Sequence, residues 1–308
     1  MMKRDLLSLR DWNQQELLDC LSLAAELKAA GPMGSYSKEL AGRSYALIFH
    51  KNSLRTRVSF EVGISQLGGS SMNLTDQDFK LGERESVADT AKVLSRYVDG
   101  ILIRTYSHTL VKELGENASV PVVNMLTNFC HPCQILADVM TIQEHFKDLS
   151  ETPICYLGDG NNIVHSWLNF ASRVPIKFTI GTTETTLPDM ELVEYSKKQG
   201  VSEVKVINDP VEAVRDAKIL YTDVWASMGE KEKAEERRKL LMPYQINSHI
   251  LSKAAPGVKI MHCLPAERGW EVTSEVLDSP QSIVLDQAEN RLHAQKAILL
   301  MLDRWFRS

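Results

Sequence analysis

Residues 45–60, YALIFHKNSLRTRVSF, run from an apolar segment through a charged turn into an amphipathic segment. The apolar residues 45–49 are typical of a strand buried on both faces of a parallel sheet. A helix is predicted over residues 58–67, ending at the glycine pair that follows. Open parallel sheets bind ligands at the carboxyl ends of their strands, near helix N-termini, so the turn at residues 50–57 is the first candidate for a functional loop.

The same alternation continues along the chain. Further strands are predicted at residues 100–103, 120–123, 154–157, 177–180, 204–207, 218–221, 258–261 and 282–285. Helices are predicted at residues 11–29, 86–97, 134–146, 163–172, 189–198, 211–216, 230–239 and 287–305. This order predicts the α/β class, with two doubly wound parallel-sheet domains and a C-terminal helix that packs back on the first. The expected domains are residues 1–147 with 288–308, and residues 148–287.

Composition restricts the class of protein. The chain has 308 residues, 44% of them hydrophobic, with a formal net charge of −5, which argues against broad binding of nucleic acid or of an anionic membrane. It shows neither a signal peptide nor an apolar run long enough for a membrane span. Five cysteines, an odd number without framework spacing, favour reduced thiols and a cytoplasmic protein. Cys130, His131 and Cys133 are too closely spaced for a zinc site, so neither a metal nor a cofactor is expected.

The turn at residues 50–57 has the composition of an anion site. Ser53 and Thr56 supply hydroxyls, and Arg55 and Arg57 supply forked cations suited to phosphate oxygens. The following helix adds free N–H groups and the positive end of its dipole. The alternative interpretation is a serine-capped helix with solvated arginines.

Four motifs in order along the chain resemble the aspartate/ornithine carbamoyltransferase family. Ser53-Leu54-Arg55-Thr56-Arg57 is similar to its carbamoyl-phosphate motif, and His131-Pro132-Cys133-Gln134 to its His-Pro-x-Gln motif. Asp223 with Ser227-Met228-Gly229 resembles the acceptor loop of the ornithine branch, and His262-Cys263-Leu264-Pro265 resembles that branch's His-Cys-Leu-Pro motif. The resemblance implies transfer of the carbamoyl group of carbamoyl phosphate to the δ-amine of L-ornithine, which gives L-citrulline and phosphate in arginine metabolism.

The resemblance also implies roles for individual residues. The first domain would bind carbamoyl phosphate, with Arg104, His131 and Cys263 as catalytic groups. The residues implied for carbamoyl phosphate are Ser53, Leu54 (through its backbone), Arg55, Thr56, Lys80, Arg104, His131, Gln134, Cys263, Leu264 and Arg291. The second domain would bind ornithine through Asn162, Asp223, Ser227 and Met228. The family assembles as trimers, so a homotrimer or a multiple of it is expected.

Three positions depart from the ornithine branch. Leu54 stands where that branch usually has Thr, and Lys80 where it usually has Gln. In the aspartate branch a lysine of this loop reaches a neighbouring active site, so Lys80 is either such a contact or a surface lysine. Glu267-Arg268 is an unusual variant of the residues that follow the His-Cys-Leu-Pro motif. This departure affects the prediction of the acceptor substrate, not that of the donor.

Other functions remain open at this stage. Putrescine or an N-acylated ornithine are alternative acceptors, but neither offers the α-ammonium group that Asp223 would pair with. A dinucleotide-dependent oxidoreductase is suggested by Leu157-Gly158-Asp159-Gly160 after a strand, yet Ile163 occupies the place of the third glycine. A catalytically inactive paralogue would be expected to lack part of the set of catalytic groups that the resemblance implies, and that set is intact here.

Overall fold

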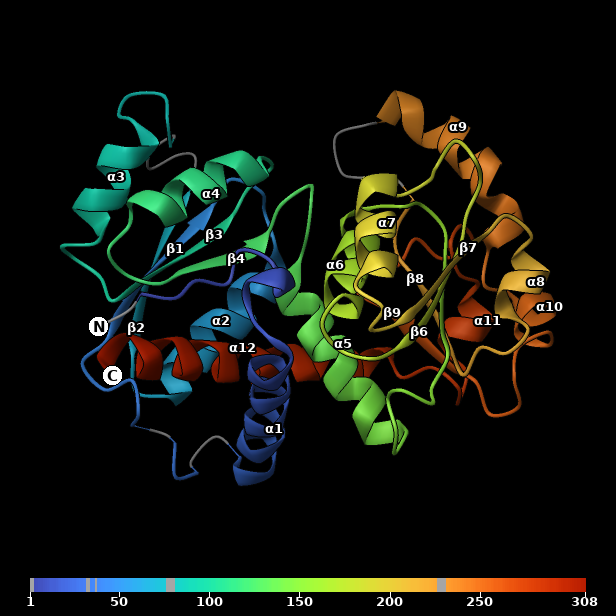
Figure 1. Ribbon diagram of the computed structural model, residues 1–308, viewed down its shortest axis with the longest axis horizontal. Helices are drawn as coiled ribbons and strands as arrows, with labels where there is room; N and C mark the ends of the chain where they lie inside the picture. Colours follow the sequence, from blue (N-terminus) through green and yellow to red (C-terminus); the bar gives the residue numbers. More distant parts are fainter. Residues whose placement is uncertain (1–2, 32–33, 37, 76–80, 226–230) are drawn as a thin grey trace. The chain divides into compact units, whose positions relative to one another are not determined.

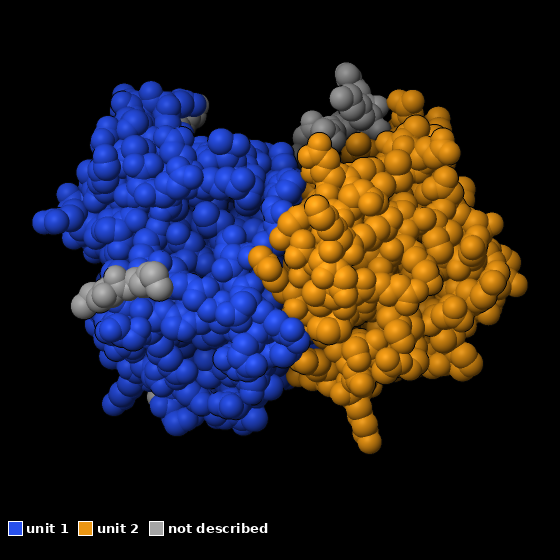
Figure 2. All heavy atoms as spheres, viewed as in Figure 1, with its two compact units in different colours: residues 1–140, 289–308 blue, residues 141–288 orange. Residues whose placement is uncertain are grey.

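The computed structural model describes residues 3–31, 34–36, 38–75, 81–225 and 231–308, with no side-chain description for 231–234. The chain forms two compact units, Met1–Met140 with Glu289–Ser308, and Thr141–Ala288 (Figure 2). The second unit therefore begins within a helix, before the domain boundary that was expected after residue 147. No helix of the described residues combines the length and the apolar character that a membrane crossing demands.

Unit 1 contains a four-stranded parallel sheet in the order β2-β1-β3-β4. Its strands are β1 (Ser44–Phe49), β2 (Ser70–Thr75), β3 (Gly100–Arg104) and β4 (Val122–Leu126). Strands β1 and β3 are neighbours, and Phe49 lies opposite Arg104 in their register. The turn after β1 and the end of β3 are therefore brought to the same edge of the sheet.

Helices cover both faces of this sheet. Helices α3 (Val87–Leu94) and α4 (His108–Asn117) pack on one face, where Ile48, Ile101 and Ile103 join their buried side chains in one core cluster (Figure 1). Helices α1 (Gln14–Ala30), α2 (Leu54–Gln66) and α12 (Val284–Arg307) lie on the other face (Figure 1). The part of α12 from residue 289 belongs to unit 1 and packs back on it, as predicted.

Unit 2 contains a five-stranded parallel sheet in the order β7-β6-β5-β8-β9. Its strands are β5 (Ile154–Leu157), β6 (Lys177–Gly181), β7 (Glu203–Ile207), β8 (Ile219–Thr222) and β9 (Lys259–His262). Helices α6 (Asn162–Ala171) and α7 (Met190–Lys198) lie beside it, and Trp167 of α6 stacks on Phe178 of β6 at 5.7 Å between ring centroids. Helices α8 (Pro210–Val214), α9 (Lys231–Leu241), α10 (Ser248–Leu251) and α11 (Ser274–Leu277) complete the unit. Helix α5 (Pro132–His145) spans the boundary of the two units.

The predicted elements differ most from the observed ones at four places. The helix predicted from residue 58 begins at Leu54, because Ser53 caps it and its polar first turn carries no apolar periodicity. The strand predicted at residues 282–285 is a single bridge from Ser282 to Ile260, after which α12 starts at Val284. The edge strand β2 and the polar helix α4 were missed, since neither has a continuous apolar run.

Candidate active site

The N-terminus of α2 is the first part of the site. Ser53 is its N-cap in extended conformation, and its hydroxyl accepts a hydrogen bond from the Thr56 backbone N–H at 3.2 Å. The motif at residues 53–57 therefore forms the first helical turn rather than a loop before the helix. The first backbone N–H groups of a helix have no intrahelical partner, and the dipole adds positive potential there. Leu54 projects into solvent with 76% of its surface exposed, so its side chain takes no part in this cluster.

Two arginines from distant parts of the chain converge on Thr56. The Thr56 hydroxyl, fully buried, lies 3.2 Å from Nη1 of Arg104 and 2.7 Å from Nη2 of Arg291. Arg104 ends β3 at a break in its register with β4, and Arg291 lies on α12. Both guanidinium groups are almost completely buried. Buried cations need anionic or strongly polar partners, so this arrangement is suited to an anion.

His131 and Gln134 lie at the start of α5, after β4. Both side chains are buried, and the Gln134 backbone N–H donates to the His131 carbonyl at 3.1 Å. Burial lowers the pKa of His131 well below its usual value, and the positive charges of Arg291 and Arg104 act in the same direction. The imidazole is therefore neutral near pH 7, able to donate one hydrogen bond and to accept another.

The sequence did not single out two further groups of this cluster. The charge of Lys51 also lowers the pKa of His131, and its Nζ lies 5.6 Å from the Tyr106 ring centroid. Asp138, fully buried, accepts a hydrogen bond from Nε2 of Gln134 at 2.8 Å. The i, i+4 spacing of Gln134 and Asp138 was a usable signal, because such residues share a helix face. Lys80, expected in this set, lies outside the described residues.

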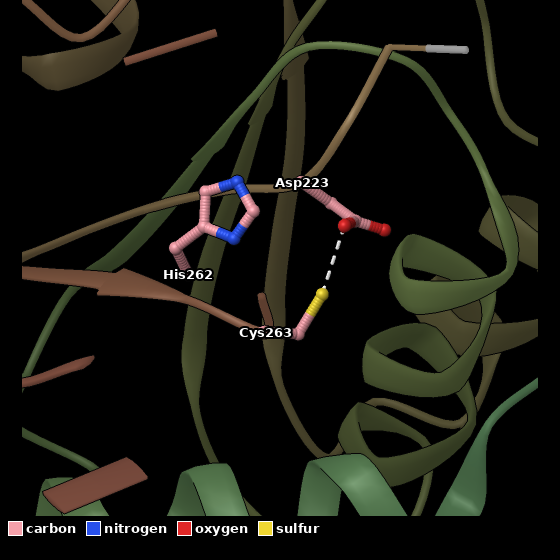
Figure 3. Close-up of side chains that lie close together, drawn as sticks. All are labelled: Asp223, His262 and Cys263. Carbon is pink, nitrogen blue, oxygen red and sulfur yellow. Dashed lines mark hydrogen bonds between the residues drawn. The ribbon is translucent and has the colours of Figure 1, made fainter. Parts of the chain in front are cut away.

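Unit 2 holds a second polar cluster, centred on Asp223. Strands β8 and β9 pair with Thr222 opposite His262, so Asp223 and Cys263, the next residue on each strand, lie side by side. The Cys263 thiol donates to Oδ1 of Asp223 at 2.8 Å (Figure 3). The same oxygen accepts the Val224 backbone N–H at 2.8 Å. Asp223 is thus held in one orientation by groups from two strands.

The turn after β5 contributes to the same cluster, though through a residue that the sequence analysis did not select. Asn161 donates from Nδ2 to Oδ2 of Asp223 at 3.1 Å, and its oxygen caps α6 by accepting the Ile163 N–H at 2.9 Å. Asn162 is the first residue of that helix and partly buried. Asn161 and Asn162 are both of a residue type that caps helices, so the sequence carried no signal that separates the two. Ser227 and Met228 lie outside the described residues.

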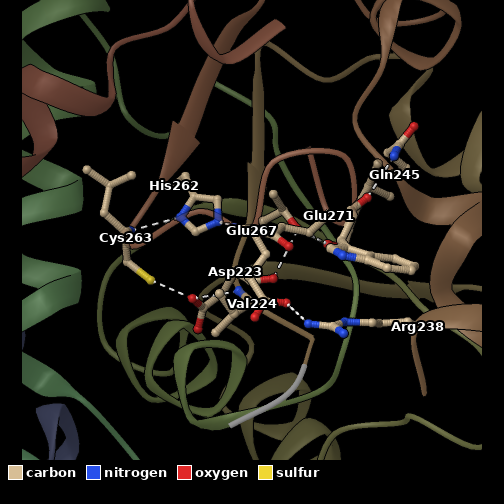
Figure 4. A network of polar contacts seen from close by, with 12 residues as sticks. Asp223, Val224, Arg238, Gln245, His262, Cys263, Glu267 and Glu271 are labelled. Carbon is tan, nitrogen blue, oxygen red and sulfur yellow. Dashed lines mark hydrogen bonds and ion pairs between the residues drawn. The ribbon is translucent and has the colours of Figure 1, made fainter. Parts of the chain in front are cut away.

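Hydrogen bonds with His262 stabilise the turn at Cys263 and Leu264. Leu264 has a φ of 56°, in the left-handed region that non-glycine residues rarely adopt. Its backbone N–H donates to Nδ1 of His262 at 2.8 Å, so the ring proton is on Nε2 and is shared with Glu271 at 3.0 Å (Figure 4). His262 also donates its backbone N–H to Gln287 at 2.8 Å. These bonds hold the strained turn in place.

Helix α9 adds an outer layer of ion pairs to this network. Arg238 lies 2.5 Å from Oε2 of Glu267 and stacks over the Trp270 ring at 4.6 Å from its centroid (Figure 4). Arg237 pairs with Asp159 at 3.3 Å. Glu267, which departs from the pattern of the ornithine branch, therefore has a partner on α9.

Asp223, His262 and Cys263 are also the one group of potential metal ligands that the described residues bring within 4.8 Å of one another. Their donor atoms already have partners in the protein. The thiol is hydrogen-bonded to Asp223, and both imidazole nitrogens of His262 form hydrogen bonds. The chemistry of this set is that of a hydrogen-bond network rather than of a cation site.

The chain matches sequence models of two domains that belong to one family. The aspartate/ornithine carbamoyltransferase carbamoyl-P binding domain matches residues 4–144, and the Asp/Orn binding domain of the same family matches residues 150–302. An ornithine carbamoyltransferase from Methanoculleus marisnigri is 48% identical over 301 residues, which are 98% of this chain and 97% of that protein. Another from Thermococcus kodakarensis is 47% identical over 302 residues, covering 97% and 96%.

Solved structures agree with the sequence matches. The ornithine carbamoyltransferase from Pyrococcus furiosus superposes with a TM-score of 0.91 at 45% identity, covering 97% of both chains. The anabolic ornithine carbamoyltransferase from Campylobacter jejuni superposes with a TM-score of 0.92 at 33% identity, covering 99% of this chain and all of the other.

Proposed function

The chain belongs to the aspartate/ornithine carbamoyltransferase family, and from this premise we infer that it transfers the carbamoyl group of carbamoyl phosphate to the δ-amine of L-ornithine. The products are L-citrulline and phosphate. The observation that carries this function is the convergence of the Arg104 and Arg291 guanidinium groups on Thr56, with neutral His131 nearby. Two buried cations beside a helix N-terminus are suited to a phosphorylated donor.

The donor is proposed to bind mainly to residues of unit 1; of the proposed set, only Cys263 and Leu264 belong to unit 2. Its phosphate accepts hydrogen bonds from the first turn of α2, from Ser53, the Leu54 backbone, Arg55 and Thr56. Arg104 and His131 bind the carbonyl oxygen, and Gln134 the amino group. The remaining members of the proposed donor set are Lys80, Cys263, Leu264 and Arg291. The neutral state of His131 supports its role as a hydrogen-bond donor that does not transfer its proton.

The acceptor is proposed to bind to residues of unit 2. Asp223 pairs with the α-ammonium group of ornithine, and Asn162, Ser227 and Met228 bind its α-carboxylate end. Asp223 is supported in this role by its position, since three groups of the turns after β5, β8 and β9 orient its carboxylate. Cys263 orients the δ-amine.

The reaction itself needs little covalent chemistry from the protein. The lone pair of the neutral δ-amine attacks the carbonyl carbon, and the developing oxyanion is stabilised by Arg104 and His131. The bond from that carbon to the bridging phosphate oxygen then breaks with its electron pair. The amine proton passes to the departing phosphate, so charge and atoms balance. Holding the two substrates in place supplies most of the remaining rate enhancement.

Comparing acceptors tests this function. Turnover is to be measured by citrulline formation with ornithine, and by the corresponding carbamoylated product with putrescine and with N-acetylornithine. Ornithine is expected to have the largest kcat/KM, because only it offers both α-groups. Faster turnover with either alternative would replace the proposed acceptor while leaving the donor unchanged. No turnover with any amine at saturating carbamoyl phosphate would overturn the function altogether.

The chain is also proposed to form a homotrimer. Helix α2 presents an exposed apolar stripe at i, i+4 and i+8, with Leu54, Val58 and Val62 exposed by 76%, 47% and 39%. An exposed apolar stripe on a helix is typical of a surface that another subunit covers. The test is the mass in solution by light scattering, where Val58→Glu is expected to give monomers. Val93→Glu, a change at an exposed side chain of α3, is expected to leave the trimer intact. A monomeric wild type would refute the proposal.

Two further assignments complete the proposal. Residues 1–147 with 288–308 form the donor domain and residues 148–287 the acceptor domain. The enzyme works in arginine metabolism in the cytoplasm, where its five cysteines, all free thiols and four of them buried, would stay reduced. Localisation of the tagged protein by fractionation checks the compartment.

A further inference from the structure

The side chain of Gln134 is oriented by a residue that the proposed mechanism does not use. Asp138 lies one helical turn after Gln134 on α5, and both side chains are buried. We propose that Asp138 is a positioning residue for donor specificity: it holds the Gln134 amide so that its oxygen is offered to the carbamoyl amino group. The inference rests on the proposed function and deepens it.

The chemistry of the contact determines which way the amide points. Nε2 of Gln134 lies 2.8 Å from Oδ1 of Asp138. An ionised carboxylate can only accept hydrogen bonds, so the NH2 end of the amide must face it. The oxygen end then points away from Asp138. An isolated glutamine has no such preference, since its two ends have nearly the same shape.

The amide oxygen is left with an unmet hydrogen-bonding capacity. Oε1 of Gln134 is buried and has no hydrogen-bond partner among the residues that the structure describes. A buried acceptor without a donor costs free energy, which a donor group of a ligand recovers. The Gln134 backbone N–H donates to the carbonyl of His131, so Gln134 lies in the same turn as a residue proposed to bind the carbonyl of the donor. The carbamoyl NH2 is a donor of the required kind.

This orientation discriminates between acyl phosphates. Acetyl phosphate has the same phosphate and carbonyl as carbamoyl phosphate, but a methyl group where the carbamoyl group has NH2. With Asp138 present, the methyl group leaves Oε1 without a donor, whereas the NH2 satisfies it. If the amide were reversed, its NH2 would face the carbamoyl NH2, donor against donor, and the preference for carbamoyl phosphate would shrink.

The decisive variant is Asp138→Asn, because it keeps the shape of the side chain. Its amide can both donate and accept, so it supports either orientation of Gln134. The measured quantity is a preference, the dissociation constant of acetyl phosphate divided by that of carbamoyl phosphate, each from calorimetric titration without ornithine. A general effect of the lost negative charge on phosphate affinity cancels in this ratio, and inorganic phosphate measures that effect separately. The preference is expected to fall about tenfold, the usual range for one buried hydrogen bond.

Gln134→Leu and the double variant Asp138→Asn with Gln134→Leu complete a thermodynamic cycle. Gln134→Leu is expected to lower the preference at least as much as Asp138→Asn does. Adding Asp138→Asn to Gln134→Leu is expected to change nothing further, because Asp138 acts only through the amide. Asp138→Ser, whose hydroxyl also donates and accepts, repeats the test if the Asn variant does not fold by circular dichroism.

Each other outcome has a distinct meaning. If Gln134→Leu lowers the preference while Asp138→Asn leaves it unchanged, the proposed function stands and the inference on Asp138 is overturned. If Asp138→Asn still lowers the preference without Gln134, Asp138 acts independently of the amide and is not its positioning residue. If neither single change alters the preference in folded protein, the role of Gln134 in donor binding fails as well.

Discussion

The polar clusters of unit 1 and unit 2 both lie at the carboxyl ends of parallel strands, but the charge at the centre of each cluster has the opposite sign. In unit 1 the groups that meet at Thr56 are cationic, and two guanidinium groups share its single hydroxyl. The carboxylate of that cluster, Asp138, accepts a hydrogen bond from Gln134 instead. In unit 2 the centre is a carboxylate, Asp223, whose two oxygens accept three hydrogen bonds. The first arrangement gathers positive charge at one hydroxyl, and the second gathers hydrogen bonds at one negative charge. The contrast indicates that the carboxyl edge of a parallel sheet can carry a site for either an anion or a cation. The side chains in the turns at that edge determine which ligand the site suits.

Removing a cation from unit 1 is expected to have the largest effect. Arg104→Gln should lower kcat/KM for carbamoyl phosphate about a thousandfold, because a buried donor to the developing oxyanion is lost. The matched control is Arg57→Gln. Arg57 is also an arginine near the donor site, in the motif at residues 53–57, but its side chain is exposed and pairs with Glu61 at 3.1 Å. Steady-state citrulline formation measures both. Equal losses in the two variants would show that general positive charge matters, not the buried convergence.

Removing the carboxylate from unit 2 should act on the other substrate. Asp223→Asn is expected to lower kcat/KM for ornithine about a hundredfold, because the charge-assisted bond to the α-ammonium is lost. Calorimetric binding of carbamoyl phosphate should stay within about twofold of wild type, since all of the proposed donor set except Cys263 and Leu264 lies in unit 1. Asp278→Asn, an exposed carboxylate paired with Arg268, serves as control. A larger loss in donor binding than in acceptor turnover would contradict the division of roles.

The pKa of His131 provides a third test of the electrostatic difference between the two clusters. Since burial and neighbouring cations hold its pKa well below the usual value, the ring is expected not to gain a proton as pH falls through 6.5. Arg291→Met removes one of these charges, so the pKa should rise and protonation should begin at higher pH. NMR titration of labelled histidine, with His131→Gln for assignment, measures this. A wild-type ring that titrates near its ordinary pKa would contradict the electrostatic picture.

The smallest effect is expected at the edge of the unit 2 cluster. Glu267→Gln removes a partly exposed ion pair with Arg238, which is worth little in water. Its backbone N–H bond to Glu271, at 2.5 Å, does not depend on the side chain. The KM for ornithine should therefore change by about twofold or less. The control is Glu151→Gln, which removes an exposed ion pair with Lys177 outside the cluster. A tenfold change would mean that this departure from the family pattern tunes the acceptor.

Much of the fold was predictable because parallel strands are buried and read as apolar runs. Residues 45–49, 100–103 and 154–157 coincide with β1, β3 and β5 to within one residue. Apolar pattern fails where an element is polar or short. It placed the start of α2 four residues late, missed β2 and α4, and read the first turn of α12 as a strand.

For the site, the sequence supplied motifs but not contacts. Ser53, Thr56, Arg104, His131 and Arg291 were all selected in advance, and in unit 1 Thr56 contacts both arginines. Asn161 was passed over for its neighbour Asn162, because one position within a helix cap cannot be told from the next by residue type alone. The ligand contacts proposed for all of the selected residues remain predictions, and Lys80, Ser227 and Met228 also lie outside the described residues.

The amino-acid sequence alone determined the family, most of the order of strands and helices, and the inventory of charged and polar groups, because these depend on local pattern and residue type. Tertiary structure decided which of those groups meet. Arg104 and Arg291 lie in distant parts of the chain, yet pairing of β1 with β3 and packing of α12 bring both to one hydroxyl. The register of β8 with β9 likewise sets Cys263 beside Asp223. These contacts follow from strand register and helix packing. Register and packing depend on many weak interactions along the whole chain, so they cannot be predicted from the type of any single residue.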